Sequence, residues 1–158
     1  MEPLRKFYSI GSIIIDDIVL PDGTTRMGIL GGGAVHAAMG MRVWTDHAGI
    51  IASVGSDLPQ KSRKQLEETF ATEGLVWRKT PTARAWQVYE STGHRTEVFR
   101  TDFDQFLQSS PLPGELKGGV IQPAGFHIQC ATPEPFISWI RASRQLGCDL
   151  VLWDKRQP

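Results

Sequence analysis

Short continuous apolar runs alternate along this chain with longer segments in which apolar residues recur every three or four positions. The runs at 7–15 and 49–54 are apolar on both faces, which is typical of strands buried within a parallel sheet. The segments 34–44 and 135–146 have helical spacing. Another helix is expected in 59–73. This alternation predicts an α/β fold.

The sequence also predicts which face of the first helix is apolar and where the second helix begins and ends. In the first helix, Val35, Met39 and Val43 lie at positions i, i+4 and i+8 and predict a buried stripe. The second helix is expected to have Asp57 as its N-cap residue and Gly74 as its stop. Both helices would therefore pack on the sheet through one face.

Two ribbons with polar turns interrupt this pattern. Residues 18–30 predict a hairpin that turns at Asp22-Gly23, because this dipeptide favours tight hairpin turns. Strands at 84–90 and 97–100 flank a second turn that contains Gly93. We expect both ribbons to be antiparallel.

The last third of the chain begins with a segment rich in Ser, Pro and Gly at 101–119, which predicts a surface connection. A strand at 125–130, the helix at 135–146 and a strand at 149–153 follow, with Gly147 as the helix stop. Such a unit extends a parallel sheet.

Three successive glycines, Gly31, Gly32 and Gly33, open directly into the first helix. Without Cβ atoms the backbone can take positive φ and come close to a ligand. The first amides of a helix have no partner within the helix, so this loop can offer donors to hydroxyls or anions. A tight turn with no ligand is the alternative interpretation.

Two carboxylates, Asp16 and Asp17, are expected at the carboxyl end of the first strand. Open α/β sheets bind their ligands at this edge. If the chain stays extended, the two side chains face in opposite directions. An Asx turn that leaves the strand is the alternative role for Asp16.

Composition and charge exclude several classes of protein. The 158 residues fit one domain, and 17 basic residues balance 17 acidic ones, so no overall field attracts nucleic acid or an anionic membrane. The apolar runs are too short to cross a bilayer. Cys130 and Cys148 form neither a disulfide framework nor a metal-binding spacing. We therefore expect a cytoplasmic protein without a metal centre.

The order of these features resembles the N-terminal half of the ribokinase-like (pfkB) family of carbohydrate kinases. The resemblance is carried by a strand ending in Asp16, the loop Leu30-Gly31-Gly32-Gly33 and the strand end Val54-Gly55-Ser56-Asp57. The segments 36–44 and 81–87 resemble the fungal branch, which includes a yeast protein needed to maintain a killer virus. The resemblance runs over most of the chain and implies a three-layer Rossmann-type sheet with a small β lid.

The resemblance also implies roles for individual residues. Asp16 would anchor a sugar through its hydroxyls, and Gly31, Gly32 and Gly33 would approach it, while the ribbons at 17–30 and 84–100 would form the lid. His36 stands where many members carry Asn, and it would make binding sensitive to pH if it faced the sugar. The lid residues Arg84 and Gln87 are further candidates for substrate contact.

The chemistry of phosphoryl transfer is absent from the sequence. No Gly-x-x-x-x-Gly-Lys-Ser/Thr and no Gly-x-Gly-Asp motif occurs. The resemblance places the catalytic base and the sites for ATP and Mg²⁺ in a C-terminal half. We therefore expect residues 1–158 to be the sugar-binding half, with no catalytic residue and without strong ATP binding of its own.

The strand at 149–153 is apolar enough to need neighbours on both sides, so the isolated chain is expected to associate through an exposed sheet. Two other functions remain as alternatives. One is a non-catalytic binding or assembly protein on the same scaffold. The other is half of a dinucleotide-binding domain, which His36 disfavours because Gly or Ala is needed at that position.

Overall fold

The computed structural model describes residues 5–116 and 122–154, and their strands form two sheets. The larger sheet has the order β5-β4-β1-β8-β9 and is parallel throughout. Its strands are β1 (Lys6–Ile10), β4 (Ala48–Gly55), β5 (Ala71–Arg78), β8 (Pro123–Ile128) and β9 (Leu150–Trp153). All eight residues of β4 are buried, which confirms the predicted two-faced strand.

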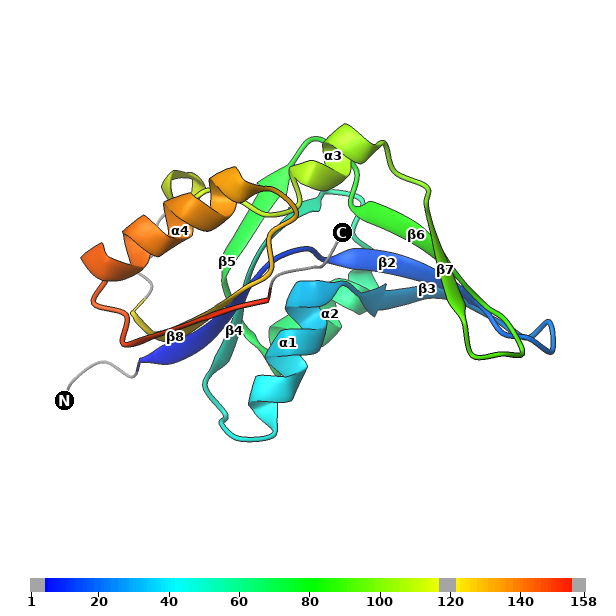
Figure 1. The fold of residues 1–158 in the computed structure, drawn as a ribbon, viewed down its shortest axis with the longest axis horizontal. Helices are drawn as coiled ribbons and strands as arrows, with labels where there is room; N and C mark the ends of the chain where they lie inside the picture. The colour runs from blue at the N-terminus through cyan, green and yellow to red at the C-terminus, as the bar shows by residue number, and fades with distance from the viewer. Residues whose placement is uncertain (1–4, 117–121, 155–158) are drawn as a thin grey trace.

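Helices cover both faces of this sheet (Figure 1). The helices α1 (Gly33–Arg42) and α2 (Gln60–Thr69) lie on one face, and α4 (Pro133–Gln145) lies on the other. Two short helices, α3 (Phe103–Leu107) and η1 (Pro113–Glu115), lie between β7 and β8 along the chain. The predicted α/β architecture with three layers is therefore confirmed.

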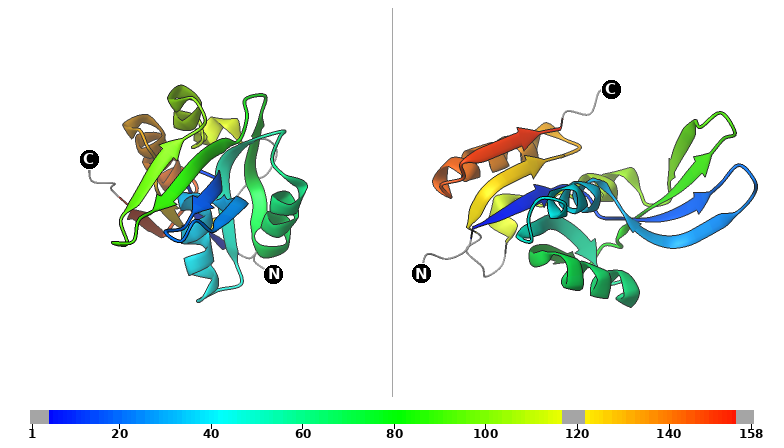
Figure 2. Two further views of the ribbon diagram at one scale, coloured as in Figure 1. Left: turned by 90° about the vertical axis from the view of Figure 1, so that its right-hand side faces the viewer. Right: turned by 90° about the horizontal axis from the view of Figure 1, so that it is seen from below.

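The smaller sheet projects from the body as an arm (Figure 2, right). Its order is β3-β2-β6-β7, from the strands β2 (Ile14–Val19), β3 (Thr25–Gly31), β6 (Ala83–Tyr89) and β7 (Arg95–Phe99). The central pair, β2 and β6, is parallel, and each is joined to its outer neighbour by a hairpin. Gly23 and Gly93 have φ of 82° and 83° in the two turns, as hairpins of this kind require.

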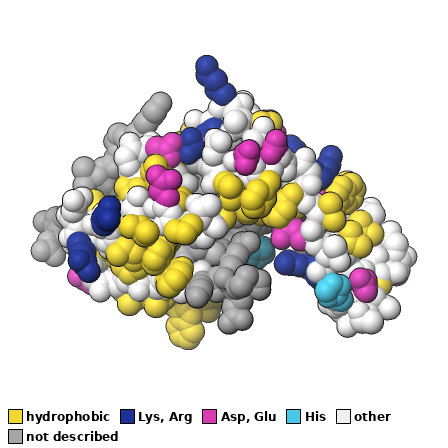
Figure 3. Space-filling view, turned by 45° about the horizontal axis from the view of Figure 1, so that its top comes forward, with side chains coloured by type: hydrophobic (Ala, Val, Ile, Leu, Met, Phe, Trp, Pro, Cys, Tyr) yellow, Lys and Arg dark blue, Asp and Glu magenta, His cyan; other side chains and the backbone are white. Residues whose placement is uncertain are grey.

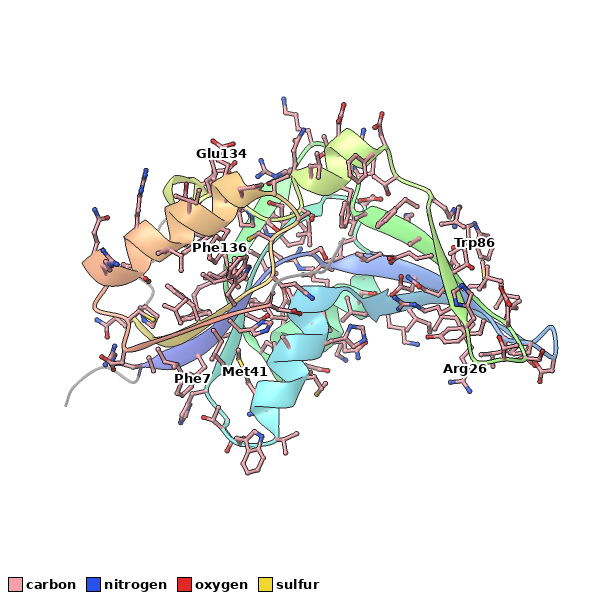
Figure 4. All side chains as sticks on the ribbon, viewed as in Figure 1. Phe7, Arg26, Met41, Trp86, Glu134 and Phe136 are labelled. Carbon is pink, nitrogen blue, oxygen red and sulfur yellow. The ribbon has the colours of Figure 1, made fainter. Side chains whose placement is uncertain are left out.

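Two hydrophobic clusters fill the body, one on each side of the larger sheet. Ile50 and Leu66 belong to the cluster under α1 and α2, and Tyr8 and Trp139 belong to the cluster under α4. Figure 4 shows Met41 on the first side and Phe136 on the second. The indole Nε1 of the fully buried Trp139 donates to the carbonyl oxygen of Pro111 at 2.7 Å.

The expected single strand at 7–15 is wrong, because the chain leaves the larger sheet after Ile10 and enters the smaller one at Ile14. At this crossing a Cβ on Gly11 would lie 2.9 Å from the carbonyl oxygen of Gln129, so only glycine fits without a shift. Asp16 therefore lies within the arm. Residues 8–17 are all buried, so burial continues without a break through the crossing.

Three helix predictions also need correction. Met39 and Val43 are exposed, because α1 packs on β1 and β4 through a narrower face that includes the small residues Ala34 and Ala38. Asp57 does not cap α2, because Pro59 occupies the N-cap position. The second helix ends at Thr69, and the expected stop at Gly74 lies inside β5.

The connection expected on the surface at 101–119 is partly buried. Phe106 of α3 packs against Phe99 with ring centroids 4.5 Å apart, and the carbonyl oxygen of Ser109 accepts from the amide of Ser53 at 2.8 Å. The part of this prediction from residue 117 onward lies outside the described residues. The segment therefore fastens the arm to the body.

Cys130 and Cys148 are both free and partly buried, and burial raises the pKa of the Cys130 thiol to about 11. Within the described ranges, no helix combines the length and the apolar character that crossing a membrane demands.

Candidate functional site

A cleft of about 670 Å³ lies between the arm and the carboxyl ends of the larger sheet's strands. The strand order creates a switch point there, because β1 pairs with β4 on one side and with the later strand β8 on the other. Open α/β sheets bind ligands at such a switch point. In Figure 3 acidic and basic side chains meet in the hollow between the body and the arm.

Asp16 reaches this cleft from β2 and is only 8% exposed. Its Oδ1 accepts a hydrogen bond from Nε2 of Gln87 at 2.9 Å, and the same Nε2 donates to Oε1 of Glu97 at 2.8 Å. Burial raises the pKa of Asp16, while the hydrogen bond from Gln87 acts in the opposite direction. A desolvated carboxylate of this kind is a strong acceptor for a ligand hydroxyl.

The three glycines let polar groups come close to the backbone at the start of α1. A Cβ on Gly31 would overlap Oδ2 of Asp16, and a Cβ on Gly33 would overlap the side-chain amide of Gln129. Gly32 has φ of 97°, which residues with a Cβ rarely adopt. Gly32 and Gly33 line the cleft, and Gly31 lies behind Asp16.

His36 lines the cleft from the first turn of α1. Its Nδ1 lies 2.9 Å from the carbonyl oxygen of Gly32. A carbonyl oxygen can only accept, so we assign the proton to Nδ1, and Nε2 of the neutral ring is then an acceptor. The side chain predicted to face a ligand is thus oriented by the glycine loop.

Five polar cleft residues were not among the sequence candidates: Arg95, Glu97, His127, Gln129 and Asp154. Nε2 of Gln129 donates to Oδ2 of Asp154 at 2.9 Å. Gln129 follows β8 directly and Asp154 follows β9, so the rule that ligands gather at the carboxyl ends of parallel strands could have identified both. Arg95 and Glu97 could be placed only after the register of β7 with β6 was known.

Arg84, Asp57 and Asp17, which the sequence analysis singled out, have hydrogen-bond or ion-pair partners outside the cleft. Arg84 lies outside the cleft, with Nη2 at 3.5 Å from Oδ2 of Asp57. Asp57 is partly buried, yet hydrogen bonds from the amide and hydroxyl of Thr82 hold its pKa below the ordinary value. Asp17 forms an ion pair with Arg100 and accepts from the amide of Gly28 at 2.8 Å. Asp17 therefore links the strands of the arm.

The described part of the cleft does not fit a nucleoside triphosphate with its metal. Its lining contains one guanidinium, Arg95, against the carboxylates of Asp16, Glu97 and Asp154. Polyphosphates need a surplus of cationic and amide donors. Within 5–116 and 122–154, no three His, Cys, Asp or Glu side chains are grouped to hold a metal ion. The cleft is instead suited to a ligand that donates hydrogen bonds.

One curated relative is an uncharacterized protein of Schizosaccharomyces pombe. It is 31% identical over 140 residues, which cover 84% of this chain and 37% of the relative. No protein family model matches the chain. The chain thus spans little more than a third of the length of this relative.

Solved kinases share the fold at low sequence identity. A ribokinase from Giardia lamblia has a TM-score of 0.73 and 15% identity, covering 96% of this chain and 50% of its own. A nucleoside kinase from Burkholderia thailandensis in complex with inosine has a TM-score of 0.70 and 16% identity, and the match covers 92% of this chain and 51% of the kinase. A ribokinase from Cryptococcus neoformans in complex with ADP has a TM-score of 0.68 and 17% identity, and the match covers 95% of this chain and 50% of the ribokinase.

This chain matches about half the length of each of these structures. Likeness at this identity concerns the fold. The chain therefore has a ribokinase-like fold, shared with kinases of the ribokinase (pfkB) family.

Proposed function

We propose that this chain is the acceptor-binding half of a ribokinase-like carbohydrate kinase. The family reaction is ATP-dependent phosphorylation of a sugar or nucleoside hydroxyl. The observation that carries the proposal is the position of Asp16, a buried carboxylate that meets the glycine loop inside the cleft between body and arm. ATP and Mg²⁺ would be bound by residues beyond those described.

The cleft residues divide the work of binding. Asp16 accepts a ligand hydroxyl, Gln87 holds that carboxylate in place, and Nε2 of His36 offers a second acceptor. Gly32 and Gly33 let the ligand approach the backbone. The arm acts as a lid, which excludes water from the reaction when it closes over the acceptor.

A non-catalytic binding protein on the same scaffold is the second candidate. It is favoured by the poor fit of the described cleft to a nucleoside triphosphate. Acceptor-dependent ADP release by the full-length S. pombe relative would favour the kinase, and binding without ADP release would favour the second candidate. The cytoplasmic location and the closer kinship with the fungal branch stay predictions from the sequence.

Isothermal titration calorimetry of this chain tests the binding site. We expect at least one of ribose, fructose, adenosine and inosine to bind, and Asp16→Ala to weaken that binding by about ten-fold or more, because a charged hydrogen-bond partner is lost. Asp104→Ala is the matched control, since Asp104 is exposed and lies outside the cleft. No binding by the panel, or equal loss in both variants, would contradict the proposal.

A further inference from the structure

Two side-chain amide oxygens in the cleft have no donor among the described residues: Oε1 of Gln87 and Oε1 of Gln129. Gln87 is 5% exposed, and its Nε2 serves both Asp16 and Glu97. Carboxylate oxygens can only accept, so the amide group must turn its nitrogen toward them. The orientation of Gln87 is therefore fixed by its neighbours, and its oxygen is the end left without a partner.

Gln129 repeats this arrangement on the opposite wall of the cleft. Its Nε2 donates to Asp154, and its Oε1 is buried beside Gly33. Buried acceptors in folded proteins almost always have a donor, from the protein, from water or from a ligand. The two amide oxygens therefore require donors that the described residues do not supply.

The charges around these oxygens restrict which ligand can supply the donors. Asp16 and Glu97 flank Gln87, and Asp154 holds Gln129, while Arg95 is the one guanidinium in the described lining. His36 has its Nδ1 engaged by Gly32 and presents Nε2, and His127 also lines the cleft. This surplus of carboxylates over cationic side chains in the described lining opposes a phosphate group, and salt screens the repulsion.

We infer that the cleft selects an uncharged, hydroxyl-rich ligand and rejects its phosphorylated form. This inference rests on the proposed function and narrows its substrate class. Sugar hydroxyls donate to the amide oxygens of Gln87 and Gln129 without adding charge. A phosphate adds acceptors and negative charge where the cleft already has both in excess.

Calorimetric titration with two matched pairs of ligands tests the inference: ribose with ribose 5-phosphate, and fructose with fructose 6-phosphate. We expect the phosphorylated member to bind about ten-fold or more weakly in each pair that binds, and the gap to shrink at high salt, because the discrimination is electrostatic. Glu97→Gln removes one negative charge while keeping an acceptor for Gln87. It should therefore reduce the difference in affinity between the neutral and the phosphorylated sugar. Glu90→Gln is the control, because Glu90 lies at the exposed tip of the same hairpin.

Gln129→Met tests the hydrogen-bonding part, because it keeps the length of the side chain and removes the amide oxygen. We expect weaker binding of the neutral sugar, with thermal denaturation used to confirm that the variant is folded. Equal or tighter binding of the phosphorylated member would overturn the inference and leave the proposed function standing. Absence of binding by every sugar and sugar phosphate would overturn both.

Discussion

At the scale of single residues, Asp16 is held in a setting that disfavours its charge. Because burial raises its pKa, the native state keeps the proton on Asp16 to a higher pH than the unfolded chain does. The free energy of unfolding therefore falls as pH rises from the ordinary Asp value through the raised native one, and the loss persists above that interval. A ligand hydroxyl would relieve this destabilisation.

Asp16→Asn is expected to stabilise the chain at pH 7, because Asn keeps an oxygen for Gln87 and carries no buried charge. At a pH below the ordinary Asp value both forms are neutral, so the difference in melting temperature should disappear. Thermal denaturation at several pH values measures this, with Asp104→Asn as the control. A less stable Asp16→Asn variant at pH 7 would contradict the linkage argument.

Gly33→Ala is expected to destabilise the chain by about 0.5–1.5 kcal/mol, because the new Cβ displaces the Gln129 amide and breaks its exposed hydrogen bond to Asp154. Gly40→Ala is the matched control in the same helix, where a Cβ meets nothing within 4 Å. It should stabilise by about 0.5–1 kcal/mol, since alanine favours helix. Urea denaturation measures the unfolding free energy of both variants. Equal effects of the two would show that the Gln129 side chain can move aside without cost.

Among elements, the arm depends on one buried carboxylate. Asp17 lies on β2, receives the amide of Gly28 on β3, and pairs with Arg100 just after β7. Arg100 also lies over the ring of Trp86, 5.2 Å from its centroid. Asp17 therefore connects both hairpins. Figure 4 labels Arg26 and Trp86, one on each ribbon of the arm.

Asp17→Asn should destabilise the arm by about 1–3 kcal/mol, because it removes the charged partner of Arg100 and keeps one acceptor for Gly28. Hydrogen exchange should rise in β3 and β7 and stay unchanged in β4. Asp46→Asn on an exposed ion pair with Arg42 is the control, and it should change the unfolding free energy by about 0.5 kcal/mol or less. A uniform rise in exchange over the body would contradict a local role.

The hairpins could be predicted from the sequence, because Asp22-Gly23 and Gly93 carry local turn signals. Asp16, His36 and Gln87 were also accessible through the family resemblance. The crossing from one sheet to the other after Ile10 could not be predicted, because Ile13 and Ile15 are as fully buried as Ile10. The sequence also could not show that Asp57 binds Thr82 instead of capping α2, since Thr82 is brought near only by tertiary structure.

At the scale of the whole molecule, β9 is an edge strand of the larger sheet as formed by the described residues. Leu150, Leu152 and Trp153 are about half exposed there. Trp153 stacks on Phe136 of α4, with ring centroids 4.4 Å apart, whereas Leu150 and Leu152 share the other face of the strand. An apolar edge of this kind favours pairing with further polypeptide.

The isolated chain is expected to associate at high concentration through this edge. Sedimentation velocity over a range of concentrations measures the association. Leu152→Lys should reduce it, because a charge on an edge strand opposes pairing. Val43→Lys, an equally drastic change on the exposed end of α1, should leave it unchanged. A monomer at all concentrations would contradict the expectation.

The parallel pairing of β2 with β6 also has a consequence for the expected order of folding. Asp16 and Gln87 meet across this pair although 71 positions separate them in the chain. Closing so long a loop is entropically costly unless the intervening α1, β4, α2 and β5 have already drawn its ends together. We therefore expect the body to form before β2 and β6 pair, so that the cleft is completed late in folding.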